Sequence, residues 1–241
     1  MEMPFGPVLQ VPNVEAAARW LCEELFFAPF KGAGALPHET ILQNGSCTIY
    51  LQKGHSTPPP APGTGRYYTG FAHIALHTPS IAEALAWCKQ RKLSLTLNGG
   101  RWFFNPKVLG EGEYYFNITA PFGAVFEVSQ PVARPGGKGA RLIDGLDHLG
   151  LPCRHFQREL ECLARLGFRP LFSPVENHNE QEGRILCGML CLGGITAEVY
   201  QFLDMEPAAM PPHNVLQGIY MQQEATTPSG THFIKRGRAD G

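Results

Sequence analysis

The chain has 241 residues, of which 44% are hydrophobic and 17% are charged, so it can bury a full core. Its formal net charge of -1 provides no basic surface of the kind that binds nucleic acid or an anionic membrane. The N-terminus has no basic region followed by an apolar stretch, and no apolar run approaches the length of a membrane span. We therefore expect a cytoplasmic globular protein with neither a nucleic acid nor a membrane as its partner.

A strand–turn–helix pattern occurs three times along the chain. Its copies align without a gap when three residues are set at the same point: Gly6, His73 and His148. A helix start then follows seven positions later in each copy, at Asn13, Ser80 and His155. Such an internal repeat predicts an architecture built from one supersecondary unit.

Each predicted helix has a local reason to form. Residues 14–25 are strong helix formers, and Ser80 with Glu83 makes a capping box ahead of an apolar stripe. The third helix carries Phe156, Leu160 and Leu163 at helical spacing. A strand is predicted before each helix and further strands after it, so each unit is predicted to be a βαβββ module.

The modules divide the chain into six parts. They are a first module at 1–54, a Pro/Gly-rich linker at 55–69, a second module at 70–130, a second linker at 131–144, a third module at 145–203, and a C-terminal extension at 204–241. Three βαβββ modules, each with one helix and mostly strands, predict an α+β fold.

Four ionisable residues recur on the frame of the second and third modules. The first strand of each carries His73 or His148, and the last strand carries Glu127 or Glu198. The separations are 54 and 50 residues, and each Glu follows a glycine by four positions. A lone histidine or glutamate on a strand is more often structural, but repetition on one frame indicates a shared metal site.

The alternation of strand residues separates two faces of each module. One face carries the four proposed ligands and can line a cleft, while the other packs against helices. We expect the packed face to contain Ile74, Leu76, Phe126, Val128, Leu149, Leu151, Ala197 and Val199. The aromatic runs at 102–104 and 114–116 offer further walls, although most such side chains belong to a core.

The sequence resembles the vicinal oxygen chelate superfamily, which includes glyoxalase I and the extradiol dioxygenases. The stretch Gly70-Phe71-Ala72-His73-Ile74-Ala75-Leu76 is similar to the family's GHIAL strand. Residues 120–127, Ala-Pro-Phe-Gly-Ala-Val-Phe-Glu, are similar to its DPxGxxxE closing strand, with Ala120 in place of the Asp. The resemblance covers roughly residues 5–202 and implies modules paired into curved mixed sheets, with helices on the outer face.

The resemblance also implies a reaction. Across His73, Glu127, His148 and Glu198 the ligand order is that of glyoxalase I, which implies one divalent ion: zinc, nickel, cobalt, manganese or iron. A glyoxalase-type lyase or isomerase acts on a small oxygenated substrate and needs a base, for which the resemblance nominates Glu198 or Glu127. The sequence does not choose between them.

Two other functions stay open. An Fe(II) extradiol-type dioxygenase would need two histidines and one glutamate, leaving Glu127 spare. A metal-free protein of the same fold could instead bind a small aromatic or drug-like molecule, as resistance proteins do.

The first module departs from this pattern. Gly6 stands at the histidine position and Tyr50 at the glutamate position, so we expect no metal there. Modules of this family pair, so the first needs a counterpart from another chain or from the tail after Asp204. We therefore expect a homodimer with a small-molecule substrate as its other partner.

Overall fold

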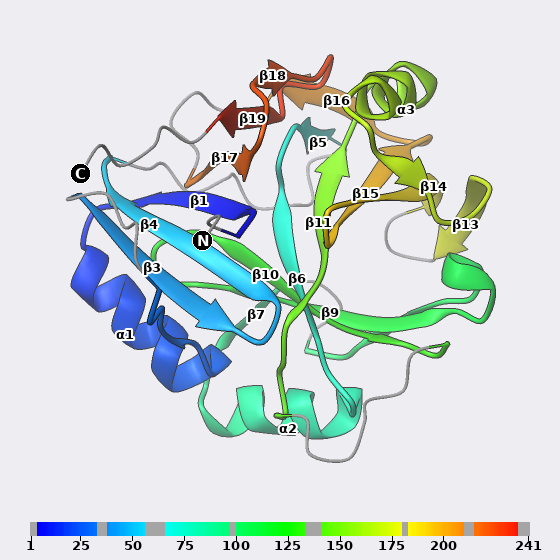
Figure 1. Cartoon of the computed structure of the whole chain (residues 1–241). Helices are drawn as coiled ribbons and strands as arrows, with labels where there is room; N and C mark the ends of the chain where they lie inside the picture. Colours follow the sequence, from blue (N-terminus) through cyan, green and yellow to red (C-terminus); the bar gives the residue numbers. More distant parts are fainter. Residues whose placement is uncertain are drawn as a thin grey trace.

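The computed structural model describes residues 4–32, 38–55, 66–96, 100–133, 141–179, 183–209 and 215–235 (Figure 1). Within these ranges lie three α-helices: α1 (Val14–Leu25), α2 (Ile81–Gln90) and α3 (Phe156–Arg165). A short 3-10 turn, η1, spans Val108–Gly110. None of the described helices is long and apolar enough to cross a membrane.

The helix starts confirm the predicted repeat. Asn13 caps α1, where its side chain accepts a hydrogen bond from the Ala16 amide at 3.0 Å. Ser80 caps α2 in the same way, accepting from the Glu83 amide at 3.3 Å. His155 is the N-cap residue of α3, but its side chain makes no capping hydrogen bond. Two of the three helices therefore begin through local side-chain chemistry.

The strands form two large sheets and one small one. The seven-stranded sheet has the order β18-β19-β17-β1-β4-β3-β2. Its strands are β1 (Gly6–Val11), β2 (Ala28–Pro29), β3 (Glu39–Asn44), β4 (Cys47–Lys53), β17 (Leu216–Met221), β18 (Ala225–Thr226) and β19 (His232–Lys235). The small sheet pairs β5 (Arg66–Thr69) with β16 (Glu206–Ala209).

The ten-stranded sheet holds the second and third modules. Its main path runs β12-β14-β15-β11-β6-β10-β9-β7, with β13 paired to β14 and β8 paired to β9. Its strands are β6 (His73–His77), β7 (Ser94–Thr96), β8 (Phe103–Asn105), β9 (Glu113–Thr119), β10 (Val125–Pro131), β11 (Leu146–Pro152), β12 (Arg169–Pro170), β13 (Val175–Asn179), β14 (Gly183–Leu192) and β15 (Ile195–Phe202).

The second and third modules pair within one chain. Their first strands, β6 and β11, run antiparallel to each other at the centre of the ten-stranded sheet (Figure 1). Each first strand also lies parallel to the last strand of its own module, β6 with β10 and β11 with β15. This ladder lies within a single chain, so the two modules do not need a second chain to pair.

The C-terminal extension supplies the counterpart of the first module. Strand β17 pairs antiparallel with β1, as β11 does with β6. Strand β19 lies parallel to β17 and antiparallel to β18, which is the strand pattern of a module without its helix. The edge of β1 is therefore covered within the chain, and the homodimer stays a prediction.

The two predicted linkers differ in content. The first, 55–69, ends in strand β5, while residues 56–65 lie outside the described residues. The second, 131–144, begins with the last residue of β10, and residues 134–140 lie outside the described part.

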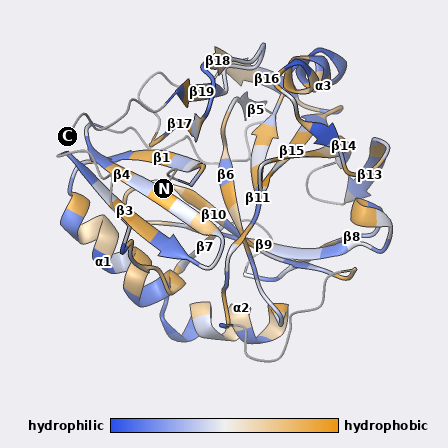
Figure 2. Ribbon diagram, in the orientation of Figure 1, coloured by the Kyte–Doolittle hydropathy of each residue, from blue (hydrophilic) through white to orange (hydrophobic). Residues whose placement is uncertain are grey.

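The helix-facing sides of both large sheets share one core. All eight residues that the sequence placed on the packed face are at most 1% exposed. Trp20 on α1 reaches the second module, with its ring centroid 5.6 Å from that of Phe122 and 6.0 Å from that of Phe126. In Figure 2, α3 is mostly blue, whereas α1 and α2 mix orange turns with blue ones. The opposite face of each sheet does not pack against these helices, so its side chains can form either a site or a second, smaller core.

Candidate metal centre

The strand register brings the four predicted residues to one face of the ten-stranded sheet. In the β6–β11 ladder, His148 lies opposite Ala75 and Gly150 lies opposite His73. Glu127 on β10 lies beside Ala75, and Glu198 on β15 lies beside Gly150. Residues paired in this way have side chains on the same face, so both histidines and both glutamates face away from the helices.

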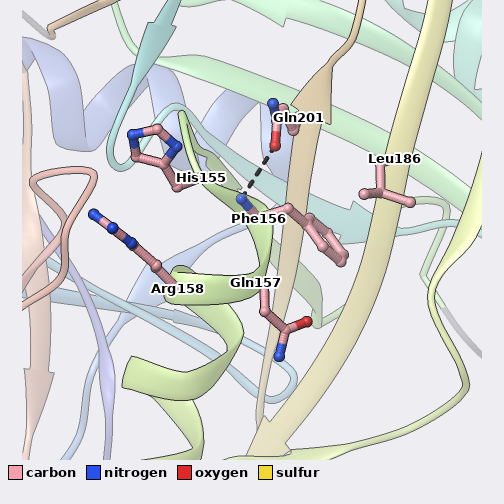
Figure 3. A pocket seen from close by; sticks show the side chains of 6 residues that line it. All are labelled: His155, Phe156, Gln157, Arg158, Leu186 and Gln201. Atoms are coloured by element: carbon pink, nitrogen blue, oxygen red, sulfur yellow. Dashed lines mark hydrogen bonds between the residues drawn. The ribbon is translucent and has the colours of Figure 1, made fainter.

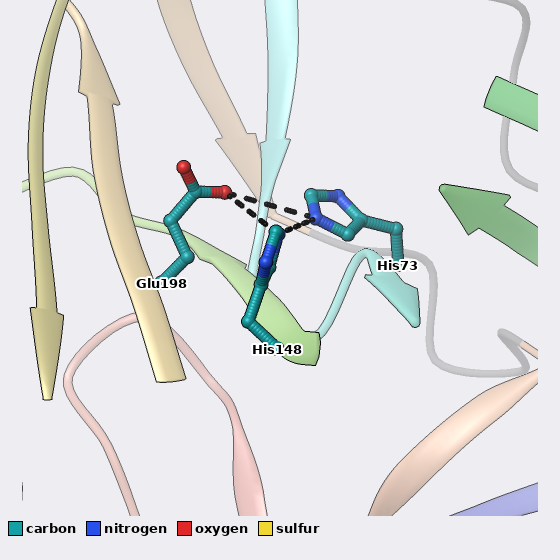
Figure 4. A group of neighbouring side chains, drawn as sticks. All are labelled: His73, His148 and Glu198. Carbon is teal, nitrogen blue, oxygen red and sulfur yellow. Dashed lines mark hydrogen bonds and ion pairs between the residues drawn. The ribbon is translucent and has the colours of Figure 1, made fainter. Parts of the chain in front are cut away.

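Their functional atoms converge on His148. Its Nε2 lies 3.2 Å from Oε1 of Glu127, 3.4 Å from Oε2 of Glu198 and 3.3 Å from Nε2 of His73. His73 Nε2 lies 3.8 Å from the same Glu198 oxygen. Figure 4 shows His73, His148 and Glu198 pointing toward one another from β6, β11 and β15. The structure therefore brings all four predicted residues together.

Gly150 makes room for one of these side chains. A Cβ atom at this position would lie 2.1 Å from Cε1 and 2.3 Å from Nε2 of His73. No real Cβ contact is that short, so any larger residue would have to displace the imidazole. Gly150 thus leaves the space that the His73 imidazole occupies.

Asp147 orients the imidazole of His148. Its Oδ1 lies 3.0 Å from His148 Nδ1, and both side chains are buried. Neighbouring residues of a regular strand point to opposite faces, but the β6–β11 register shifts between Leu146 and His148. An Nδ1–H that donates to this carboxylate leaves Nε2 to face the cluster.

The two histidines differ in charge. Burial and the neighbouring His148 lower the pKa of His73 to about 4, against the opposing effect of Glu198. Burial also acts to lower the pKa of His148, but Glu198, Asp147 and Glu127 outweigh it and hold that pKa well above its usual value. Burial acts to raise the pKa of Glu198, but His148 and then His73 bring it down to about 2. Without an ion, these shifts favour a protonated His148 beside the carboxylates and a neutral His73.

Three residues outside the predicted set also lie at the cluster: Glu113, Asp147 and Cys187. The Cys187 thiol donates to Glu198 Oε1 at 3.4 Å. Burial, followed by Glu198, raises the pKa of Cys187 well above its usual value, so the thiol stays protonated. Glu113 is 2% exposed and accepts a hydrogen bond from Ser129. Only Asp147 had a local signal, as the residue next to a proposed ligand.

Aromatic rings flank the cluster on the same face. The Tyr200 ring stacks on His73 with centroids 5.9 Å apart, and Phe103 stacks on Tyr115 at 5.1 Å. Tyr115 lies opposite Ser129 in the β9–β10 ladder, two residues from Glu127. Part of each predicted aromatic run therefore lines the site, while Phe116 is buried in the core.

A surface pocket of about 430 Å³ lies elsewhere, at the start of α3 (Figure 3). Gln201 lines it and accepts a hydrogen bond from the Phe156 amide at 3.1 Å. Residue 201 alternates with Tyr200 along β15, so its side chain leaves the opposite face of the sheet from Glu198. The pocket is separate from the His/Glu cluster.

The donor set fits a divalent ion. Two ligand atoms bound to one tetrahedral zinc ion at about 2.1 Å lie about 3.4 Å apart. The three distances from His148 Nε2, 3.2 to 3.4 Å, match this spacing. Neutral imidazoles and carboxylates are also the ligands that zinc, nickel, cobalt, manganese and iron accept in proteins. His73, His148 and Glu198, whose ligand atoms all lie within 4.8 Å of one another, could hold such an ion, with Glu127 beside His148.

No protein-family model and no curated protein sequence matches this chain. Its fold is similar to that of glyoxalase I from Zea mays, seen in a point mutant with a TM-score of 0.63 and 12% identity over 95% of this chain and 91% of that chain. A second mutant of the maize enzyme gives a TM-score of 0.60 and 13% identity over 90% and 74% of the two chains.

A protein from Bacillus subtilis proposed to be a dioxygenase is also similar, with a TM-score of 0.58 and 12% identity over 89% of this chain and 68% of that chain. Identities this low establish a shared fold and nothing of the reaction. They confirm the predicted α+β fold built from repeated βαβββ modules.

Proposed function

We propose that this protein is a divalent-metal-dependent lyase or isomerase of glyoxalase type that acts on a small oxygenated substrate. The observation that carries the proposal is the convergence on His148 Nε2, which has His73, Glu127 and Glu198 between 3.2 and 3.4 Å away. The ligands are His73, Glu127, His148 and Glu198. The similarity of fold to glyoxalase I supports the same reading.

The protein prepares its ligands for the ion. His73 is already neutral, and Asp147 holds His148 so that Nε2 points into the cluster once its proton is released. When bound, a divalent ion polarises a carbonyl oxygen of the substrate and stabilises negative charge on it. The residues around it set the orientation and exclude water.

Glu198 is the better placed of the two candidate bases. Its side chain is 14% exposed, against 7% for that of Glu127, so it lies nearer the side from which a substrate arrives. The Cys187 thiol holds its Oε1, leaving Oε2 facing both imidazoles. We propose that Glu198 moves the proton between neighbouring carbons and that Glu127 stays a ligand.

A ring-cleaving Fe(II) dioxygenase is the second candidate. The ligand atoms of His73, His148 and Glu198 all lie within 4.8 Å of one another, which gives two histidines and one carboxylate without Glu127. This set is typical of non-haem Fe(II) oxygenases. The aromatic rings of Tyr200 and Phe103 could contact an aromatic substrate on the same face.

The metal content of the purified protein tests both candidates. Protein prepared without chelator or nickel resin should carry about one equivalent of a divalent ion, and His148→Ala should carry none. The matched control is His155→Ala, since that histidine lies at the start of α3 and makes no capping bond. Absence of metal from the wild-type protein, even after reconstitution, would overturn both enzymes and leave a metal-free binding protein.

The identity of the ion and two assays separate the candidates. Nickel, zinc, cobalt or manganese with conversion of a hemithioacetal supports the lyase or isomerase. Iron with oxygen-dependent cleavage of a catechol supports the dioxygenase. Failure to convert hemithioacetals with any of these reconstituted metals would count against the first proposal.

A homodimer and a cytoplasmic location remain part of the proposal. The strand edge that favoured association is covered by β17, so a dimer would use another surface. Light scattering behind a sizing column measures the mass, and 26.5 kDa would be a monomer.

A further inference from the structure

A further carboxyl group lies beside Glu127 in the His/Glu cluster. Glu113 is 2% exposed, and its carboxylate lies within 4.8 Å of the ligand atoms of both Glu127 and His148. It stands on β9, where Asn117 and Tyr115 share its face and Asn117 lies opposite Glu127. The four-ligand set does not use it.

The side chains around Glu113 hold it in place. The Ser129 hydroxyl, itself fully buried, donates to Glu113 Oε1. Asn117 is 7% exposed, and its Oδ1 has no hydrogen-bond partner although it is buried on the face that carries Glu127. A buried acceptor without a partner destabilises the fold, and an ion bound nearby would offset that cost.

Two groups of three ligand atoms therefore meet at one histidine. The outer group is His73, His148 and Glu198, and the inner group is Glu113, Glu127 and His148. All three residues of the inner group are buried, whereas Glu198 of the outer group is only partly buried. His148 Nε2 has one lone pair and binds one ion at a time, so the two positions exclude each other. An ion in the inner position therefore takes both His148 and Glu127 out of the four-ligand set.

We propose that a divalent ion in this site has two overlapping positions that share His148, and that Glu113 is a ligand of the inner one. This inference rests on the proposed metal function. Two imidazoles and a carboxylate make the outer position suited to zinc and similar ions. Two carboxylates and one imidazole make the inner position suited to harder ions such as Mn²⁺, and the unpartnered Asn117 oxygen on the same face is a candidate further ligand.

Calorimetric titration of the metal-free full chain with Zn²⁺ and with Mn²⁺ tests the proposal. Glu113→Gln should weaken Mn²⁺ binding by about tenfold or more and change Zn²⁺ binding by less than about threefold. His73→Ala should do the reverse. The paramagnetic resonance spectrum of bound Mn²⁺ should change in Glu113→Gln, a readout that does not depend on activity.

Glu159→Gln is the matched control. Glu159 is also a fully buried carboxyl group, but it lies on α3 and accepts a hydrogen bond from the Ser229 amide at 3.1 Å. It should leave the affinity for both ions within about twofold of wild type. If Glu113→Gln does not fold, Asn117→Ala takes its place and should weaken Mn²⁺ binding while sparing Zn²⁺.

Each outcome has a distinct meaning. Equal losses for both ions in Glu113→Gln, or no loss for either, would overturn the inner position while leaving the metal function intact. Wild-type protein that binds neither ion would instead overturn the proposed function itself. Selective loss of Mn²⁺, with Glu159→Gln unchanged, supports Glu113 as a ligand.

Discussion

The two large sheets share one strand order around their central pair of strands, yet among the described residues only the ten-stranded sheet gathers histidines and glutamates at the centre of the face away from the helices. Its four central positions in the ladders are His73, Glu127, His148 and Glu198. The same register positions in the seven-stranded sheet hold Gly6, Tyr50, Gly218 and Ile234. Like Gly6 and Tyr50 of the first module, Gly218 and Ile234 of the tail strands therefore provide no histidine or carboxylate ligand at these positions.

The seven-stranded sheet fills this face with its own side chains. Tyr50 and Tyr220 meet edge to face with centroids 4.8 Å apart, and Ile234 packs against them. A Cβ at Gly6 would lie 2.0 Å from the carbonyl oxygen of Thr48, and one at Gly218 would lie 2.6 Å from that of His232. No side chain fits at either position, so the backbone that forms a metal cluster in one sheet forms a small core in the other.

Removal of the Tyr50 ring should give the largest loss of stability in the seven-stranded sheet. Tyr50 is fully buried and donates to the Pro4 carbonyl oxygen at 2.5 Å. Tyr50→Ala should lower the free energy of unfolding by about 3–5 kcal/mol, because it leaves a cavity. Urea denaturation measures this loss, and metal content serves as the control. A fall in metal content of the folded variant would mean that the two faces are coupled.

Asp147→Asn should weaken the metal site without unfolding the protein. An amide cannot hold the His148 Nδ1–H as a carboxylate does, so the affinity for the ion should fall by about 10- to 100-fold. Asp204→Asn is the matched control, since Asp204 pairs with Arg184 on the surface. Isothermal titration with zinc measures both variants. Equal affinities in the two would show that Asp147 has no part in positioning the imidazole.

Gly150→Ala should disturb the metal face through sterics alone. The added methyl group meets the His73 ring at 2.1 Å, so stability should fall by about 1–3 kcal/mol and metal affinity should fall with it. In a His73→Ala background the same change should cost less, because the ring is gone. A thermal-unfolding cycle of the four proteins checks this. Equal costs in both backgrounds would contradict the steric explanation.

Tyr220→Phe should have the smallest effect. The Tyr220 hydroxyl donates to Glu39 Oε1 at 2.7 Å and accepts from Gln52 Nε2 at 2.9 Å. Its loss should cost about 1 kcal/mol, since Gln52 still donates to Glu39. Urea denaturation measures the change. A cost as large as that of Tyr50→Ala would show that this hydrogen-bond network, and not ring packing, stabilises the face.

The local pattern of the sequence was enough to predict the repeat and to identify the four cluster residues. Helix starts at Asn13, Ser80 and His155 depend on caps and on residues within one turn, which are neighbours in sequence. Strand alternation then fixes which face each of His73, Glu127, His148 and Glu198 occupies. The second and third modules have the same order of strands and helix. The histidines on their first strands and the glutamates on their last strands therefore occupy corresponding places in the folded structure.

Only the tertiary structure shows which strands pair between modules and which further residues surround the cluster. Strand β17 covers β1 although 205 residues or more separate them, and no local pattern in the tail predicted it. Glu113 and Cys187 reach the cluster only because β9 and β14 lie beside β10 and β15. The sequence by itself determined the modules, their faces and the four central residues, since these follow from short-range periodicity. The pairing of modules and the surroundings of the site depend on contacts between distant segments, which only the folded chain specifies.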